Sequence, residues 1–134
     1  MQFVHNIPTL IARRMRMYHA WGKSIAIDLY DCPPEMVNDP KLLKSFIKDL
    51  LVQIKMKPHG PTYIDRFGDP ELHLEGYSAM QFIETSTVTV HLDEVDNRAF
   101  IDIFSCQDFD TDSTSQFCKN YFRANEMKIV PLQR

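Results

Sequence analysis

The chain has 134 residues and a formal net charge of −3, with 44% of its residues hydrophobic and 25% charged. This length suits one domain with one core, and the composition excludes a mainly disordered protein. The negative net charge does not suit a nucleic-acid-binding surface. The sequence also has no apolar run long enough to span a membrane and no signal-peptide core. We therefore expect a cytoplasmic protein without membrane or nucleic-acid partners.

The first twenty residues differ from the rest of the chain. They include Arg13, Arg14 and Arg16 but no acidic residue, and their apolar residues recur at a helical spacing. A basic segment without acidic residues is also typical of an organelle presequence. We expect residues 1–20 to form a helical extension that packs on the domain or its partner, and the domain itself to span residues 21–134.

A strand and a long helix are expected next. Residues 24–32 alternate between apolar and polar side chains, which predicts a strand. Asp39 followed by Pro40 is typical of a helix start, because aspartate caps free N–H groups and proline fits the first turn. An apolar stripe over residues 42–54 then predicts the body of this helix.

Short strand patterns dominate the second half of the chain. We expect strands at about 62–66, 72–83, 87–92 and 99–106, a helix capped by Asp112 or Ser113, and a last strand at 127–132. The resulting order, β-α-β-β-β-β-α-β, predicts an α+β fold. This is a two-layer α/β sandwich whose mainly antiparallel sheet has two helices on one face.

The two central strand patterns have faces of different character. Val88 and Val90 alternate with hydroxyl side chains and His91, while Ile103 alternates with polar or aromatic neighbours that end in Cys106. Two helices cover only the aliphatic face of such a sheet. The other face needs a second cover or carries a site, and a two-fold dimer that stacks these faces satisfies both needs.

Neither disulfides nor a metal site are expected. The three cysteines, Cys32, Cys106 and Cys118, are odd in number and have no short pairing distance. The five histidines form no HExxH motif and no paired Cys/His group, which are the usual signatures of a zinc site.

Four reactive side chains stand near the ends of the strand patterns. They are Ser78 in Gly-Tyr-Ser, Ser86 in Thr-Ser, His91 in Val-Thr-Val-His and Cys106 in Asp-Ile-Phe-Ser-Cys. A serine can itself become a cofactor, because its hydroxyl can attack the carbonyl just before it. The resulting ester undergoes β-elimination, and the new chain then begins with a ketone, the pyruvoyl group.

From about Trp21 to its C-terminus, the chain resembles the short prokaryotic form of S-adenosylmethionine decarboxylase, a pyruvoyl enzyme of polyamine synthesis. The family motifs Gly-x-Ser, Ile-Ser-Ile-His and Asp-Val-Phe-Thr-Cys resemble the sequences that end in Ser78, His91 and Cys106. The cleavage point of the family falls just before Ser86. The gaps between the four residues also agree with the family pattern, which is more specific than any one residue.

The resemblance implies a role for each of these residues. The chain would cleave itself between Thr85 and Ser86, and Ser86 would become the pyruvoyl group that binds substrate as a Schiff base. His91 would take the serine α-proton during processing, Ser78 would hydrogen-bond the processing intermediate, and Cys106 would return a proton after CO₂ leaves. The resemblance also implies a homodimer that converts S-adenosylmethionine into the aminopropyl donor for spermidine.

Two segments depart from the family pattern. Residues 85–87 read Thr-Ser-Thr where the family has Glu-Ser-His, although cleavage uses the carbonyl of residue 85 and not its side chain. Residues 92–95 read Leu-Asp-Glu-Val where the family has Thr-Trp-Pro-Glu, which helps to build the nucleoside pocket. Asp93 and Glu94 form either a solvated hairpin loop or a site for a cation, such as a sulfonium or the distal group of a basic amino acid.

Two alternative functions therefore stay open. The same pyruvoyl chemistry can serve an ornithine or arginine decarboxylase. A chain that stays uncleaved would instead be a non-catalytic homologue that acts as a binding or regulatory subunit. Cleavage separates the second alternative from the others, because an unprocessed chain has no ketone.

Overall fold

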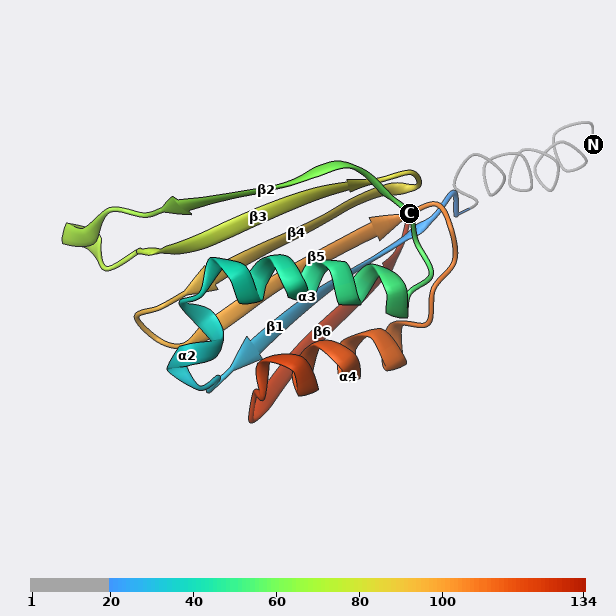
Figure 1. Cartoon of the computed structure of the whole chain (residues 1–134). Coiled ribbons are helices and arrows are strands. Elements are labelled where there is room, and N and C mark those ends of the chain that lie inside the picture. The colour runs from blue at the N-terminus through green and yellow to red at the C-terminus, as the bar shows by residue number, and fades with distance from the viewer. Residues whose placement is uncertain (1–19) are drawn as a thin grey trace, which may run out of the picture.

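The computed structural model describes residues 20–134. The elements, in chain order, are β1 (Lys23–Tyr30), α2 (Pro34–Val37), α3 (Pro40–Gln53), β2 (Pro58–Phe67), a 3₁₀ turn (Pro70–Leu72), β3 (Gly76–Ile83), β4 (Ser86–Asp93), β5 (Arg98–Ser105), α4 (Thr111–Phe122) and β6 (Glu126–Gln133). This is the predicted order with one short helix, α2, added (Figure 1). The expected helical extension spans residues 1–20, and all of it except residue 20 lies outside the described residues.

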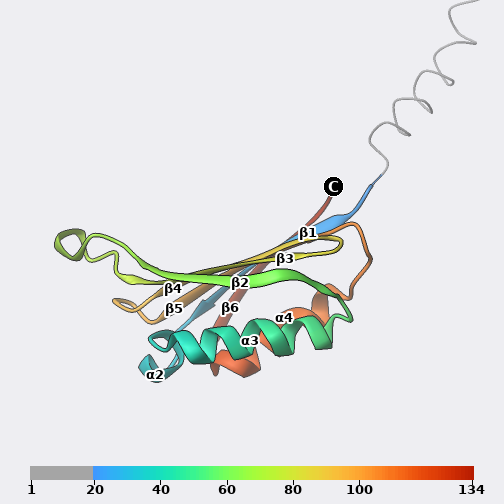
Figure 2. The ribbon, with the colours of Figure 1, turned by 45° about the horizontal axis from the view of Figure 1, so that its top comes forward.

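All six strands form one sheet in the order β2-β3-β4-β5-β1-β6, and every neighbouring pair is antiparallel. Helices α3 and α4 lie on one face of this sheet (Figure 2). The α+β two-layer sandwich is therefore confirmed. None of the helices within residues 20–134 covers the opposite face, which we call the open face. Strand pairing and alternation place on it Ser24, Asp28, Tyr63, Phe67, Ser78, Met80, Phe82, Thr89, His91, Asp102, Phe104, Val130 and Leu132.

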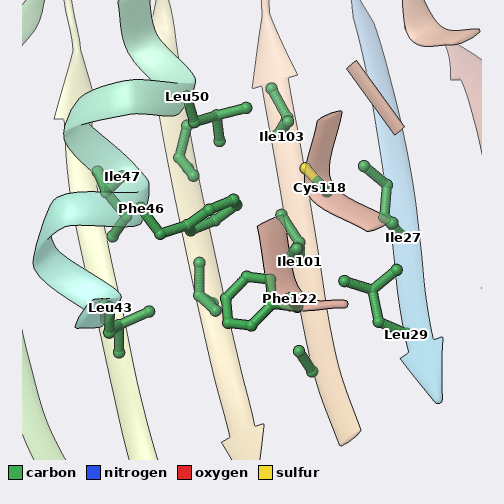
Figure 3. Packing of buried hydrophobic residues seen from close by; sticks show 14 of the residues in the cluster. Ile27, Leu29, Leu43, Phe46, Ile47, Leu50, Ile101, Ile103, Cys118 and Phe122 are labelled. Atoms are coloured by element: carbon green, nitrogen blue, oxygen red, sulfur yellow. The ribbon is translucent and has the colours of Figure 1, made fainter. Parts of the chain in front are cut away.

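The core lies between the sheet and the helices (Figure 3). Its sheet side comes from the aliphatic members of the alternating patterns, such as Ile27 and Ile103, which are fully buried. On the helix side, Phe46 of α3 packs against Phe122 of α4 with the ring centroids 4.7 Å apart. The core therefore uses the faces that periodicity predicted, and within residues 20–134 no helix packs on the open face.

The helix starts show how local chemistry sets the boundaries. Asp39 caps α3 as predicted, because its carboxylate accepts the N–H of Lys41 at 2.8 Å. The cap of α4 is Asp110, whereas Asp112 or Ser113 was expected. The Asp110 carboxylate accepts the N–H of Ser113 at 2.9 Å, so the cap lies two residues earlier than the sequence pattern indicated.

Two strand boundaries also differ from the expectation. The predicted strand at 72–83 begins only at Gly76, because Pro70–Leu72 forms a 3₁₀ turn and His73 adopts a left-handed backbone with φ of 54°. The element expected at 62–66 extends over the whole of β2, with an irregular register near its start. No helix of the described part of the chain is long and apolar enough to cross a membrane.

Candidate active site

The predicted cleavage bond lies at the β3–β4 hairpin. Ile83 pairs with Ser86, so Glu84 and Thr85 form a two-residue turn and the Thr85–Ser86 bond lies at its exit. Cys106 follows the end of β5 directly, and its backbone N–H donates a hydrogen bond to the Thr85 carbonyl at 3.0 Å. We call Thr85, Ser86 and Cys106 the cleavage half-site.

This hydrogen bond has a chemical consequence. An N–H that points at a carbonyl oxygen polarises the carbonyl and stabilises the oxyanion that forms when a nucleophile adds to it. The carbonyl in question is the one that a Ser86 hydroxyl would attack. The cleavage half-site therefore already holds one donor of an oxyanion hole.

The cysteines differ in their exposure. Burial raises the pKa of Cys32 to about 11 and that of Cys118 to about 12, so both thiols stay protonated inside the core. Cys106 is exposed beside the cleavage bond. It is the only cysteine of the chain whose thiol can meet a molecule from the solvent.

Ser78 and His91 form a second pair, which we call the histidine half-site. They lie directly opposite each other on β3 and β4, and the Ser78 Oγ is 2.8 Å from the His91 Nδ1. A Cβ at Gly76 would collide with the Leu92 carbonyl oxygen, so a glycine two residues before Ser78 lets the two strands approach closely here. The pair borders an open-face pocket of about 440 Å³ whose other lining residues include Tyr63, Phe67, Met80 and Thr89.

The two half-sites are far apart within one chain. Five residues of extended strand separate Ser86 from His91, which is roughly 16 Å at 3.3 Å per residue. The Ser78 hydroxyl and the His91 imidazole therefore cannot reach the Thr85 carbonyl of their own chain. The structure brings Ser86 together with Cys106, and Ser78 together with His91, but it does not join the two pairs.

Comparison with known proteins identifies the family. A family model described as S-adenosylmethionine decarboxylase matches residues 23–134. The chain belongs to the S-adenosylmethionine decarboxylase family. Among solved structures, the crystal structure of the adenosylmethionine decarboxylase from Aquifex aeolicus is similar, with a TM-score of 0.71 and 13% sequence identity over 86% of this chain and 91% of that chain. At this identity the likeness shows the fold alone. A search of curated proteins found no match.

The S-adenosylmethionine decarboxylase family generally depends on a pyruvoyl group, and the residues of this chain fit such a group. Ser86 would supply the hydroxyl from which such a group is made. The carbonyl before it accepts a hydrogen bond from the Cys106 N–H, and Cys106 is exposed. The serine, the carbonyl that its hydroxyl would attack and the backbone of Cys106 are therefore adjacent, whereas Ser78 and His91 lie elsewhere on the sheet.

The carboxylates of Asp93 and Glu94 both accept hydrogen bonds from arginine side chains of this chain. Arg98 Nε donates to the Asp93 carboxylate at 2.7 Å, and Arg66 makes two hydrogen bonds to Glu94 at 2.5 and 2.9 Å. Asp93, the last residue of β4, also accepts the N–H of Val95 at 3.0 Å, so its carboxylate holds the start of the β4–β5 turn. This geometry favours the hairpin-loop interpretation, because a substrate cation would have to displace an arginine.

Sequence reasoning missed these two arginines and also Asp102. Asp102 lies on the open face opposite Thr89, diagonal to His91. Partial desolvation and the nearby Asp28 carboxylate raise the pKa of Asp102, whereas His91 lowers it. Arg98 follows Asp93 across a short turn and was recognisable from the hairpin pattern. Arg66 and Asp102 had no such local signal, because their partners lie on other strands.

Proposed function

We propose that this chain is a self-processing, pyruvoyl-dependent decarboxylase that acts on S-adenosylmethionine and so supplies an aminopropyl donor for spermidine synthesis. The observation that carries the proposal is the hydrogen bond from the Cys106 N–H to the Thr85 carbonyl. It continues the β4–β5 strand pairing by one step and so places the backbone of the expected proton donor against the expected cleavage bond. Membership of the S-adenosylmethionine decarboxylase family supports the reaction class.

Processing uses only groups of the chain and one water molecule. The Ser86 Oγ attacks the Thr85 carbonyl carbon, the peptide C–N bond breaks, and an ester joins Thr85 to the side chain of Ser86. Loss of the Ser86 α-proton then breaks the Cβ–O bond and releases Thr85 as a carboxylate. Hydrolysis of the remaining dehydroalanine end, after it tautomerises to an imine, releases ammonia and leaves a ketone at position 86.

A second copy of the chain completes the site. We place a two-fold axis between two stacked open faces, where it crosses β4 near Thr89. The β4 strands of the two copies then run in opposite directions. The His91 end of one β4 then lies over the Ser86 end of the other. Under this arrangement Ser78 and His91 of one chain serve the cleavage half-site of its partner, which resolves the separation of roughly 16 Å.

The surface of the open face supports this assembly. It presents large apolar side chains whose exposed fractions run from 37% to 57%: Tyr63, Phe67, Met80, Phe82, Val130 and Leu132. Tyr63, Phe67, Met80 and Phe82 lie together on the neighbouring strands β2 and β3, and Val130 and Leu132 lie on β6 at the other edge of the sheet. Exposed apolar surface of this kind typically marks an interaction site. A stacked dimer would bury these side chains and also exclude water from the two half-sites.

Decarboxylation needs an electron sink and a proton donor. The pyruvoyl group, once formed, supplies the electron sink for loss of CO₂ from an amine-bearing acid. Cys106 would hold the proton that returns to the substrate carbon, since this cysteine is exposed and its backbone N–H binds the carbonyl that precedes residue 86. Thiol acidity is easily tuned by the surroundings, which suits a general acid.

Cys106→Ala is expected to cleave but to decarboxylate poorly. Cleavage uses the backbone N–H of residue 106, which alanine keeps, whereas proton return uses the thiol, which alanine lacks. General acid catalysis contributes ~10²–10⁴-fold, so turnover should fall by that factor. Single-turnover CO₂ release from the cleaved variant measures it, with the buried Cys118→Ala variant as the matched control. Full turnover by Cys106→Ala would contradict the role of the thiol.

The substrate is tested by CO₂ release from S-adenosylmethionine, ornithine and arginine, each offered separately to the cleaved protein. We expect turnover of S-adenosylmethionine, because Arg98 and Arg66 already neutralise the carboxylates that a basic amino acid would use. Turnover of only ornithine or arginine would reject this substrate and keep the mechanism. In that case Glu94→Lys should reduce turnover far more than Glu94→Gln does.

A further inference from the structure

Thr85 is held by its side chain as well as by its carbonyl. The Ser105 Oγ donates a hydrogen bond to the Thr85 Oγ1 at 2.8 Å, and the Thr85 hydroxyl in turn donates to the Met56 Sδ at 3.7 Å. The backbone N–H of Gln107 donates to the Ser105 Oγ at 3.0 Å. These contacts form a directed chain of donors that runs from the end of β5 into the β3–β4 turn.

The last residue of β5 and the residue that follows it therefore both hydrogen-bond to Thr85 in the β3–β4 turn. Ser105 binds the side chain of Thr85, and Cys106 binds its carbonyl. Threonine is branched at Cβ and has few allowed χ1 values, so one hydrogen bond to its Oγ1 restricts the orientation of the whole residue. Ser105 also pairs with Ser86 across the strands, so it contacts one residue of the cleavage bond by its side chain and lies opposite the other.

We infer that Ser105 is a positioning residue for self-cleavage, which holds Thr85 so that its carbonyl oxygen stays on the Cys106 N–H and its carbonyl carbon stays open to the Ser86 hydroxyl. The inference rests on the proposed self-cleavage. It also explains how this chain works with threonine at position 85, because a serine on the neighbouring strand matches the threonine hydroxyl.

The burial of Ser105 makes this role specific. Ser105 is fully buried, and a buried hydroxyl needs a hydrogen-bond partner wherever it lies. Ser115 is almost as buried, at 2% exposed, and it meets that need locally by donating to the Asp112 carbonyl of its own helix at 3.0 Å. Ser105 instead donates to a side chain twenty residues away, on the residue that provides the cleavage carbonyl.

Ser105→Ala and Thr85→Val are the test variants, since each removes one hydroxyl of the pair and Thr85→Val keeps the branched shape. Displacement of a reacting group by about 1 Å costs on the order of 10²-fold in rate, so cleavage should slow by about that factor in both. The double variant should be no slower than either single variant, because both remove the same contact. Thr85→Ser keeps the hydroxyl and should retain most of the rate.

Ser115→Ala is the matched control, because it also deletes a buried serine hydroxyl. The half-time of cleavage is followed by intact-mass spectrometry, and the midpoint of urea unfolding is measured for each variant. We expect Ser115→Ala to lose stability and to cleave at the wild-type rate. Cleavage of Ser105→Ala at the wild-type rate, or equal slowing in Ser115→Ala, would overturn the inference.

A second readout does not depend on cleavage. In the uncleavable Ser86→Ala background, hydrogen exchange reports whether the Cys106 amide is protected by the Thr85 carbonyl. Adding Ser105→Ala should lower that protection by at least tenfold, while adding Ser115→Ala should leave it unchanged. If the wild-type chain never cleaves, the proposed function fails, and the exchange result still decides whether Ser105 holds the turn.

Discussion

Ser86→Ala is expected to remain one full-length chain, whereas the wild-type chain splits into residues 1–85 and 86–134. In the proposed reaction the Ser86 hydroxyl attacks the Thr85 carbonyl carbon, and alanine has no hydroxyl. The carbonyl and its Cys106 donor stay in place, so the loss should be complete and not a partial slowing. Intact-mass spectrometry after prolonged incubation measures the two fragments, and N-terminal sequencing should find the second one blocked.

The matched control is Ser113→Ala, which removes an exposed serine hydroxyl at the start of α4 and should cleave normally. A wild-type chain that stays whole, with an unmodified Ser86, would remove the enzyme hypothesis. The remaining explanation would then be an uncleaved homologue that binds or regulates another subunit.

Mixing two defective variants is expected to restore cleavage. His91→Ala alone should cleave ~10²–10⁴-fold more slowly, because it lacks the imidazole that takes the α-proton. Ser86→Ala alone should not cleave at all. In a mixed dimer, the His91→Ala chain keeps an intact cleavage half-site and meets the intact histidine half-site of the Ser86→Ala chain. The His91→Ala chain should therefore be cut at close to the wild-type rate within that dimer.

The reason lies in the length of β4. Ser86 is its first residue and His91 lies five positions further along, roughly 16 Å away, so they can cooperate only between chains whose strands run in opposite directions. Different affinity tags on the two variants allow the mixed dimer to be isolated after the subunits are refolded together. Mass spectrometry then shows which chain was cut.

The control uses the double variant Ser86→Ala, His91→Ala as the helper chain. It forms the same interface but brings no imidazole, so it should not rescue cleavage. If the His91→Ala chain is cut no faster in the mixed dimer than alone, the half-sites do not combine across copies. Wild-type cleavage by His91→Ala alone would instead remove His91 from processing.

The amino-acid sequence by itself determined most of the fold. The alternation around Ile27 and Val88 predicted which sheet face is buried, and the apolar stripe of residues 42–54 predicted α3 and its core face. These features depend on neighbours within one or two turns of the chain, so they are readable locally. The register of Ser78, Ser86, His91 and Cys106 likewise pointed to the family that the comparison then identified.

The tertiary structure decided which of those residues meet. Sequence spacing placed Ser86 closer to His91 than to Cys106, yet strand pairing brings the Cys106 N–H onto the Thr85 carbonyl and leaves His91 at the far end of β4. Likewise, only the fold shows that Arg66 neutralises Glu94 and that Ser105 holds Thr85. The physical reason is the same in each case: these contacts join residues of different strands or turns. Local periodicity shows which face of the sheet a side chain takes, but it does not show which residue of another segment lies beside that side chain.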